Sequence, residues 1–311
     1  MTRFPVNKLK VVLSLITRDN DYQLEQAKAA EAVAHQRNVD LEIFYADNDS
    51  VTQSSQLLDV IHKYKSELNA ILVEPAGGTE FPQVGRAAVS AGIAWVVLNR
   101  DARSLADLRR NLQAPTFAVS SDHKQVGRIQ AQQLAAILPQ TATVLYILGP
   151  ANSLAAQQRL VGLEGAKSSG MTLKILKSPN WTEEGGFHAA SSWLRLTTSQ
   201  QQPICAVAAQ NDSIAIGARR AFEEAKAVLP SGTWSQLPFL GVDGLPRTGQ
   251  AFVNRGSLIA TVVVPPVAGP ALEAVVKAIT TKTEPPDLQL IPSYSYPAIE
   301  SLRPITVAAH R

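Results

Sequence analysis

Pairs of polar side chains stand directly after apolar runs in the sequence, at the points where buried strands would end. The stretch "VAAQND" ends in Asn211 and Asp212 and leads straight into a helical pattern, while "AWVVL" is followed by Asn99 and Arg100. Amides, guanidiniums and carboxylates are planar groups that make paired hydrogen bonds with hydroxyls. Together with aromatic rings, which pack on the C–H face of a cyclic ligand, they favour a polyhydroxylated small molecule.

The same residue types also have purely structural uses at these positions. Asp122, Asn152 and Asp212 stand where helical patterns begin, and a side-chain oxygen at a helix start accepts backbone N–H bonds. The "VDG" stretch that contains Asp243 is also compatible with an ordinary Asp-Gly turn. We expect Asp122 and Asp212 to cap helices, and Asn211 to contact a ligand.

The sequence contains none of the motifs that would indicate an enzyme of a familiar class. It has no G-x-S-x-G, no Walker-type G-x-x-x-x-G-K-[ST], no G-x-G-x-x-G after a strand and no H-E-x-x-H. The histidines are dispersed, and the single cysteine, Cys205, lies in an apolar run typical of a core residue. We therefore expect a protein that is not an enzyme, with no cofactor and no metal site.

The composition indicates a soluble globular protein of one large or two medium domains. The chain has 311 residues, of which 45% are hydrophobic, enough to fill substantial cores. Its 29 Lys and Arg exceed its 26 Asp and Glu by only three, and the basic residues are scattered. We therefore expect no nucleic-acid partner.

The N-terminal segment has a basic start and an apolar run, as a signal peptide would. The run from Val11 to Ile16 is shorter than the roughly 7 to 15 residues of a signal-peptide core, and charged residues follow it. We interpret it as the first strand, so no export signal is recognised. The most apolar window, residues 258–279, is interrupted by prolines and Glu273, which predicts no membrane insertion.

Short apolar runs alternate with helical patterns along most of the chain. Ten runs are rich in β-branched or aromatic residues and are predicted strands: 11–16, 41–46, 70–73, 94–99, 117–120, 143–149, 173–178, 205–209, 239–243 and 259–264. Helices are predicted at 24–36, 53–63, 81–91, 123–138, 153–169, 183–196 and 213–226. Near-continuous apolar strands indicate parallel sheets covered on both faces. We expect an α/β protein of two doubly wound lobes, with the irregular segment 101–115 as the place to look for their junction.

Six segments in a fixed order resemble a known family. They are "NRD" at 99–101, "SSDHKQVGRIQAQQL" at 120–134, "GPANSLAAQQRLVGLEGA" at 149–166, "AQNDSIAIGARRAF" at 209–222, "FLGVDG" at 239–244 and "GSLIATVVV" at 256–264. The combination resembles the type I periplasmic sugar-binding proteins, particularly ribose-binding-like members. The same fold forms the effector core of lactose-repressor-type regulators. The resemblance covers roughly residues 8–291.

The resemblance implies the type I periplasmic-binding-protein fold, in which two lobes close on a small ligand around a hinge of three chain crossings. It implies an N-terminal lobe of residues 1–121 with 265–291, and a C-terminal lobe of residues 122–264 with 292–311. It also implies a ligand site made of Asn20, Tyr22, Asn99, Arg100 and Ser121 from the first lobe and of Arg159, Trp181, Asn211 and Asp243 from the second.

The sequence departs from the ribose-type pattern at three positions. Asn99 stands where those proteins usually have Asp, Val264 where a hinge Gln or Asn is common, and Gln23 where a second aromatic residue often follows Tyr22. Ribose is therefore expected to bind poorly. A hexose, a deoxy or modified sugar, or a sugar acid is expected to bind better.

The charges of the implied site leave the charge of the ligand open. Arg100 and Arg159 stand against Asp243 alone, two positive groups and one negative, which gives a net charge of about +1. Such a site accepts either a neutral sugar or an anionic relative.

The resemblance implies a solute-binding protein for a sugar or sugar-like ligand, with the permease subunits of an ABC importer as partner. The alternative is a ligand-sensing subunit that signals to a regulatory partner. A DNA-binding repressor is disfavoured, because the roughly nine residues before the first strand are too few for a helix-turn-helix. The resemblance implies a periplasmic or other extracytoplasmic location, and the unrecognised export signal leaves a cytoplasmic one open.

Overall fold

The structure is a computed structural model of the chain, and it describes residues 8–78, 81–100, 105–110, 114–196, 204–226 and 237–305. Its contacts divide the chain into two units. The first unit is Met1–Ser121 with Pro266–Ile291, and the second is Asp122–Pro265 with Pro292–Arg311. The chain therefore passes from one unit to the other three times.

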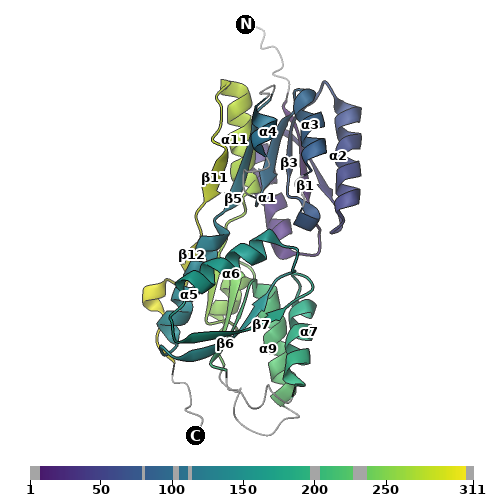
Figure 1. Cartoon of the computed structure of the whole chain (residues 1–311). Coiled ribbons are helices and arrows are strands. Elements are labelled where there is room, and N and C mark those ends of the chain that lie inside the picture. The colour runs from purple at the N-terminus through teal and green to yellow at the C-terminus, as the bar shows by residue number, and fades with distance from the viewer. Residues whose placement is uncertain are drawn as a thin grey trace. The chain divides into compact units, whose positions relative to one another are not determined.

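The first unit contains one parallel sheet covered by helices (Figure 1). Its strand order is β11-β5-β4-β3-β1-β2, and all of its pairings are parallel. The strands are β1 (Lys10–Leu15), β2 (Asp40–Tyr45), β3 (Leu68–Val73), β4 (Ala94–Leu98), β5 (Thr116–Ser121) and β11 (Leu288–Ile291). The helices are α1 (Asp21–Arg37), α2 (Ser50–Tyr64), α3 (Pro82–Ser90), the short α4 (Ala106–Arg109) and α11 (Ala268–Thr281).

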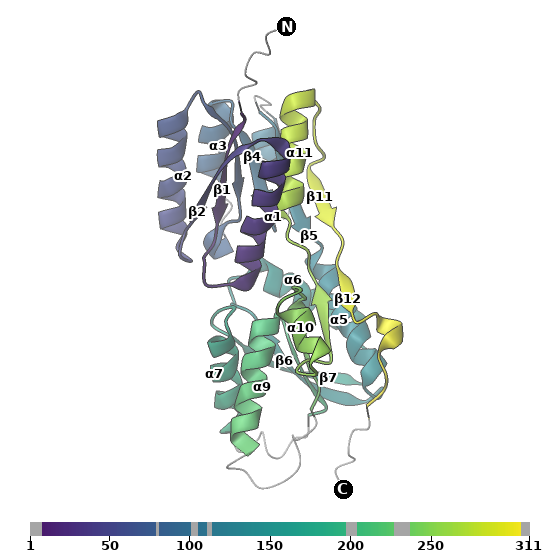
Figure 2. The ribbon, with the colours of Figure 1, turned by 180° about the vertical axis from the view of Figure 1, so that it is seen from behind.

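The strand β1 shows why helices cover both faces of this sheet. Val11 and Leu13 belong to the core beneath α1 and α11, whereas Val12 belongs to the core beneath α2 and α3. Successive residues of a strand point to opposite faces, so a strand that is apolar at every position is buried on both. Helices α1 and α11, far apart in the sequence, lie side by side on one of these faces (Figure 2).

The second unit repeats this plan with one antiparallel strand. Its sheet has the order β12-β10-β9-β8-β6-β7, in which β12 runs antiparallel to β10 and the other pairings are parallel. The strands are β6 (Ala142–Leu148), β7 (Met171–Lys177), β8 (Ala206–Ala209), β9 (Phe239–Asp243), β10 (Ala260–Val263) and β12 (Tyr294–Tyr296). The helices are α5 (His123–Ile137), α6 (Leu154–Ala166), α7 (Glu183–Leu194), α9 (Asp212–Lys226) and α10 (Gly249–Asn254).

The strand β6 likewise faces two cores in the second unit. Leu145 packs in the core beneath α7 and α9, together with Phe222. Tyr146 packs in the core beneath α5 and α6, together with Leu134. Both faces of this sheet are therefore covered, and the prediction of two doubly wound α/β lobes is confirmed.

The ten predicted strands and seven predicted helices all occur, with their ends shifted by a few residues. The strands β11 and β12, which are short and flanked by prolines, were not predicted, and neither were the helices α4, α10 and α11. The expectation of a lobe junction at 101–115 is wrong, because β5 follows this segment and pairs with β4 in the first sheet, with Ala118 opposite Val97. Asp101 lies outside the described residues.

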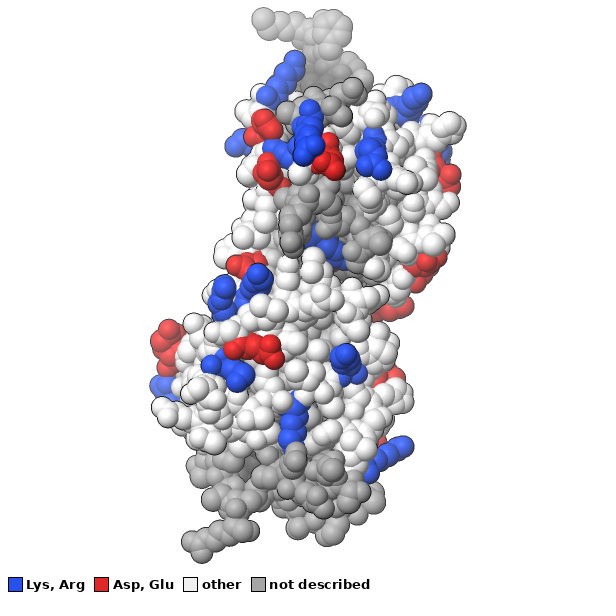
Figure 3. All heavy atoms as spheres, viewed as in Figure 1, with Lys and Arg blue, Asp and Glu red and all other residues white. Residues whose placement is uncertain are grey.

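Charged side chains of both signs share the surface of the described residues. On the face shown in Figure 3, Lys and Arg side chains are interspersed with Asp and Glu. In the described ranges, no helix combines the length and the apolar character needed to cross a bilayer.

Candidate functional site

Buried polar side chains gather at the carboxyl ends of neighbouring strands in the first unit. Glu74 directly follows β3, Asn99 and Arg100 follow β4, and Ser121 ends β5, and each of the four is at most 8% exposed. The carboxyl ends of parallel strands lie along one edge of the sheet, where ligands bind in doubly wound folds. The structure thus brings three predicted residues of this unit together with Glu74.

Glu74 is a functional candidate that the sequence analysis missed. Its Oε1 accepts a hydrogen bond from Asn99 Nδ2 at 3.0 Å, and its Oε2 accepts one from Gln26 Nε2, also at 3.0 Å. The signal for it was present, because Glu74 follows the apolar run "AILV" just as Asn99 follows "AWVVL". Applying the rule of polar strand ends to this third strand would have identified it.

Arg100 is fixed by the main chain around it. Its Nη1 donates to the Asn99 carbonyl oxygen at 2.8 Å, and its Nη2 donates to the Pro75 carbonyl oxygen at 2.6 Å. Asn99 itself has a left-handed backbone, with φ of 55°. The hydroxyl of Ser121 is buried and has no hydrogen-bond partner among the described residues, which is unusual for a buried polar group.

Asn20 and Tyr22 lie at the start of α1. Asn20 is the N-cap, and its side-chain oxygen accepts from the backbone N–H groups of Tyr22, at 2.8 Å, and Gln23, at 3.3 Å. The Gln23 side chain in turn accepts from Ile16 N at 3.0 Å. Gln23, which stands where the ribose-type pattern often has a second aromatic residue, thus links the end of β1 to α1 by a hydrogen bond.

In the second unit, Arg159 extends from α6, which packs very closely against α5. A Cβ atom on Gly127 of α5 would lie 2.0 Å from the Arg159 carbonyl oxygen, and one on Gly162 of α6 would lie 2.0 Å from the Lys124 carbonyl oxygen. Only glycine fits at both positions. The two glycines therefore determine where the Arg159 backbone lies.

Arg159, Trp181 and Asp243 come together in the second unit. Arg159 Nη2 lies 3.6 Å from Asp243 Oδ1, and its guanidinium carbon lies 5.6 Å from the centre of the Trp181 ring. Arg159 Nη1 donates a hydrogen bond to the Gln210 carbonyl oxygen. A guanidinium, a carboxylate and an indole in one cluster are the groups that bind hydroxyls and the apolar face of a ring.

The backbone at Asp243 is held in an uncommon conformation. Asp243 has φ of 101° and Gly244 has φ of 56°, so two successive residues are left-handed. A Cβ atom on Gly244 would lie 2.7 Å from Val263 Cα, so only glycine fits there. Strained residues of this kind cluster at functional sites.

The structure corrects the expected capping role of Asp212 and assigns the cap to Asn211, whose expected contact with a ligand stays a prediction. Asn211 is the residue at the start of α9 whose Oδ1 accepts from Ile214 N at 2.8 Å, and its Nδ2 donates to the Trp181 carbonyl oxygen at 3.0 Å. Asp212 does not cap the helix. Its Oδ1 accepts from Thr261 Oγ1 at 2.6 Å and its Oδ2 from Gly244 N at 2.8 Å, so it links the start of α9 to Thr261 in β10 and to Gly244 directly after β9.

Asp212 has an altered proton affinity. Burial raises the pKa of its carboxyl well above the ordinary value, and the neighbouring carboxylate of Asp243 raises it further. The hydrogen bonds from Thr261 and Gly244 and the charge of Arg159 act in the opposite direction and are outweighed. The carboxyl of Asp212 is therefore protonated more readily than an ordinary carboxyl.

Gln210 is a second residue that the sequence analysis passed over. It is fully buried, its Oε1 accepts from Gly149 N at 2.9 Å, and its Nε2 donates to the Ala156 carbonyl oxygen at 2.8 Å and to Tyr146 Oη at 3.2 Å. Burial raises the pKa of Tyr146, which keeps its hydroxyl neutral. This side chain links β6, α6 and β8 behind Arg159.

Asp122 and Asn152 are the other two residues that stand at predicted helix starts. Asp122 is the N-cap of α5, as expected, and its side chain accepts from Gln125 N at 2.9 Å. The reading of Asn152 as a cap is wrong, because Ser153 caps α6 and accepts from Ala156 N at 3.3 Å.

The charge count at the predicted residues changes once Glu74 is included. Arg100 and Arg159 stand against Asp243 and Glu74, which balances the formal charges at two against two. The earlier count of about +1 omitted this carboxylate. In the described part of the chain, no group of three or more His, Cys, Asp or Glu side chains could hold a metal ion.

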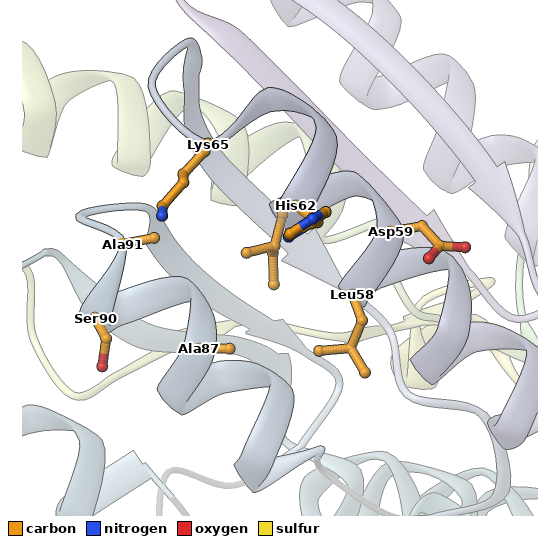
Figure 4. Close-up of a pocket in the computed structure, with 8 residues that line it drawn as sticks. Leu58, Asp59, His62, Lys65, Ala87, Ser90 and Ala91 are labelled. Atoms are coloured by element: carbon orange, nitrogen blue, oxygen red, sulfur yellow. The ribbon is translucent and has the colours of Figure 1, made fainter.

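A hollow of about 580 Å³ lies elsewhere on the first unit, between α2 and α3 (Figure 4). The close-up labels seven of the residues that line it, namely Leu58, Asp59, His62, Lys65, Ala87, Ser90 and Ala91, and Ile61 lines it as well. None of the nine predicted site residues lines it. It is therefore distinct from the strand-end cluster.

Comparison with known proteins gives relatives that bind sugars and polyols. The chain is 27% identical over 256 residues to the D-ribose/D-allose-binding protein of Pseudomonas aeruginosa, covering 82% of this chain and 76% of that protein. It is 28% identical over 269 residues to the xylitol-binding protein of Mycolicibacterium smegmatis, covering 84% of this chain and 70% of that protein.

A solved structure has the same fold. The periplasmic solute-binding protein of an ABC transporter from Actinobacillus succinogenes, with bound D-allose, superposes with a TM-score of 0.79 at 24% identity, covering 93% of this chain and 97% of that one. Residues 11–282 match the family model described as periplasmic binding protein domain, which confirms the resemblance inferred from the sequence. The chain therefore belongs to the periplasmic binding protein domain family.

Proposed function

We propose that this protein binds a sugar or sugar-like polyol outside the cytoplasmic membrane and delivers it to the permease of an ABC importer. The observation that carries the proposal is the cluster of Arg159, Trp181 and Asp243, which offers hydrogen-bond donors, an acceptor and an aromatic face within one unit. The names of the relatives, which bind ribose, allose and xylitol, support the same class of ligand.

The residues proposed to contact the ligand come from both units, as the resemblance implies. Seven of the nine lie at strand ends or helix starts, which supports this role, because such positions combine fixed side chains with unpaired helix N–H groups. They are Asn20, Tyr22, Asn99, Arg100 and Ser121 of the first unit and Arg159, Trp181, Asn211 and Asp243 of the second.

The ligand is proposed to differ from ribose and to be uncharged. Asn99 replaces the carboxylate of the ribose-type pattern, so the set of donors and acceptors offered to the ligand is altered. Leaving one buried donor unpaired costs about 1 to 3 kcal/mol, enough to reorder closely related sugars. The balance of Arg100 and Arg159 against Glu74 and Asp243 supports a neutral ligand over an acid.

Calorimetry with a fixed panel tests this function. The panel is D-ribose, D-allose, D-galactose, xylitol and myo-inositol, with D-gluconate and D-galacturonate as acids. We expect at least one neutral member to bind in the micromolar range or tighter, with D-ribose and the acids weaker. Submicromolar binding of D-ribose would contradict the proposed ligand choice, and no binding across the panel would contradict the sugar-binding function.

Uptake tests the importer role separately from binding. Deletion of the gene from its own organism should abolish uptake of the bound, labelled sugar, and the full-length gene product should fractionate outside the cytoplasmic membrane. Normal uptake with loss of a transcriptional response to the same sugar would instead support a sensor.

A further inference from the structure

We propose that Glu74 is a positioning residue that fixes the Asn99 side-chain amide so that Asn99 Oδ1 accepts a hydrogen bond from the ligand. The inference rests on the proposed function, and it assigns a role to a residue outside the nine predicted ones. The carrying observation is a directed series of buried hydrogen bonds from α11 to Asn99.

The series begins at a group that can only donate. The backbone N–H of Ala268 donates to Gln26 Oε1 at 2.8 Å, so the Gln26 amide has one possible orientation, with its Nε2 facing Glu74. An ionised carboxylate can only accept. Both oxygens of Glu74 therefore receive N–H groups, Oε2 from Gln26 and Oε1 from Asn99.

The orientation of the Asn99 amide follows from this order. Its Nδ2 must face Glu74, because the reversed amide would set Asn99 Oδ1 against a carboxylate oxygen. Gln26, Glu74 and Asn99 are 0%, 5% and 5% exposed, so water does not compensate a reversed amide.

The rest of the surroundings hold Glu74 and Asn99 in place. Glu74 N donates to Ser14 O at 2.9 Å, and the Glu74 carbonyl oxygen accepts from Gln53 Nε2 at 3.0 Å. Asn99 N donates to Val119 O at 2.9 Å. Neither residue can move without breaking bonds to neighbouring strands.

The remaining polar atom of Asn99, Oδ1, is available to accept a hydrogen bond from a ligand. Its Oδ1 is buried and has no hydrogen-bond partner among the described residues. Buried polar atoms are nearly always paired, so an unpaired acceptor at a strand end calls for a donor from outside the chain. A ligand hydroxyl supplies that donor. Position 99 of this chain thus still offers a hydrogen-bond acceptor to the ligand. The negative charge, however, lies on Glu74 and not on residue 99.

The test compares Glu74→Gln with Ile71→Val. The glutamine has one acceptor oxygen for the two N–H groups of Gln26 and Asn99, so the Asn99 amide is released or reversed. Ile71 is a fully buried apolar residue of β3, the strand that Glu74 directly follows, and it makes none of these hydrogen bonds. The Ile71→Val variant therefore shows how a general loss of stability affects the measurements.

The first readout needs no ligand. In the ¹⁵N-labelled full-length protein, the side-chain amide signals of Asn99 are identified by their absence from Asn99→Asp. We expect both Asn99 proton signals to shift in Glu74→Gln and to stay in place in Ile71→Val. Unchanged Asn99 signals in Glu74→Gln would overturn the positioning role.

The second readout is calorimetric binding of the tightest neutral sugar from the panel named above. We expect Glu74→Gln to raise its Kd by about tenfold or more, because a ligand hydroxyl loses its acceptor, and Ile71→Val to change it by less than about twofold. An equal Kd in Glu74→Gln and wild type would overturn the acceptor role. If no panel member binds, the acceptor role fails together with the proposed function, while the amide signals still decide whether Glu74 positions Asn99.

Discussion

Arg159 and Asp243 form an ion pair within the second unit in which Nη2 lies 3.6 Å from Oδ1. The two side chains are only 7% and 14% exposed, so the pair is largely removed from water. The separation is longer than that of a good hydrogen bond, and Arg159 Nε has no hydrogen-bond partner among the described residues. Arg159 thus retains donor capacity for a ligand hydroxyl.

Replacing Asp243 with Asn should weaken ligand binding by roughly 5- to 10-fold. The reason is that a hydrogen bond to a charged group contributes about 1.5 to 3 kcal/mol and a neutral one about 0.5 to 1.5 kcal/mol, so Asn loses about 1 to 1.5 kcal/mol. Calorimetry with the tightest neutral sugar measures the change. Glu223→Gln is the matched control, because it breaks an exposed Arg–carboxylate pair with Arg219 in the same unit. A lower melting temperature with unchanged affinity would show that Asp243 stabilises the turn after β9 and does not contact the ligand.

Asp212 should make the protein less stable as pH rises above about 4. Its raised pKa means that the folded state keeps a proton that the unfolded chain has lost. Its contribution to the free energy of unfolding is therefore complete below the unfolded pKa, and it falls by about 1.4 kcal/mol per pH unit up to the folded pKa.

Asp212→Asn should remove this slope. The Asn side chain can donate to Thr261 Oγ1 and accept from Gly244 N, so it resembles the protonated acid. Urea unfolding at several pH values should show the variant gaining on the wild type as pH rises. A difference independent of pH would mean that Asp212 titrates alike in both states.

Asn211→Ala should lower the free energy of unfolding by about 0.5 to 2 kcal/mol, the usual cost of a lost helix cap. Asn211→Ser keeps an oxygen for Ile214 N but loses the bond to the Trp181 carbonyl, so it separates the two roles. Chemical unfolding measures stability and calorimetry measures sugar affinity. We expect Ser to restore most of the stability. Equal stability of Ala and Ser would contradict capping by Asn211.

Gly149→Ala should displace the Trp181 ring and weaken sugar binding. A Cβ atom on Gly149 would lie 2.1 Å from Trp181 Cη2, and overpacking of this kind costs about 1 to 3 kcal/mol. Gly165→Ala is the control, because a Cβ there meets no atom within 4 Å. Tryptophan fluorescence and calorimetry follow the ring and the affinity. Unchanged fluorescence and unchanged affinity in Gly149→Ala would show that the added methyl group fits without displacing the ring.

Most of the secondary structure could be predicted from the amino-acid sequence. Apolar strands such as β1 and β6 are buried on both faces, so their periodicity is visible without any tertiary contact. The short strands β11 and β12 were missed because their pairing partners β5 and β10 lie far away in the sequence. The same cause misplaced the junction, since only pairing with β4 assigns β5 to the first unit.

The sequence also predicted a ligand site at polar strand ends, but it could not divide the roles among neighbouring residues. Asn211 and Asp212 are both good helix caps, and the choice depends on Thr261 and Gly244, which reach Asp212 from other strands. Glu74 could have been found in the sequence as a polar residue after an apolar strand, but only the fold places it between Gln26 and Asn99. Local sequence determines which groups can form hydrogen bonds, whereas tertiary structure decides which partners are close enough, because a hydrogen bond needs atoms within about 3 Å.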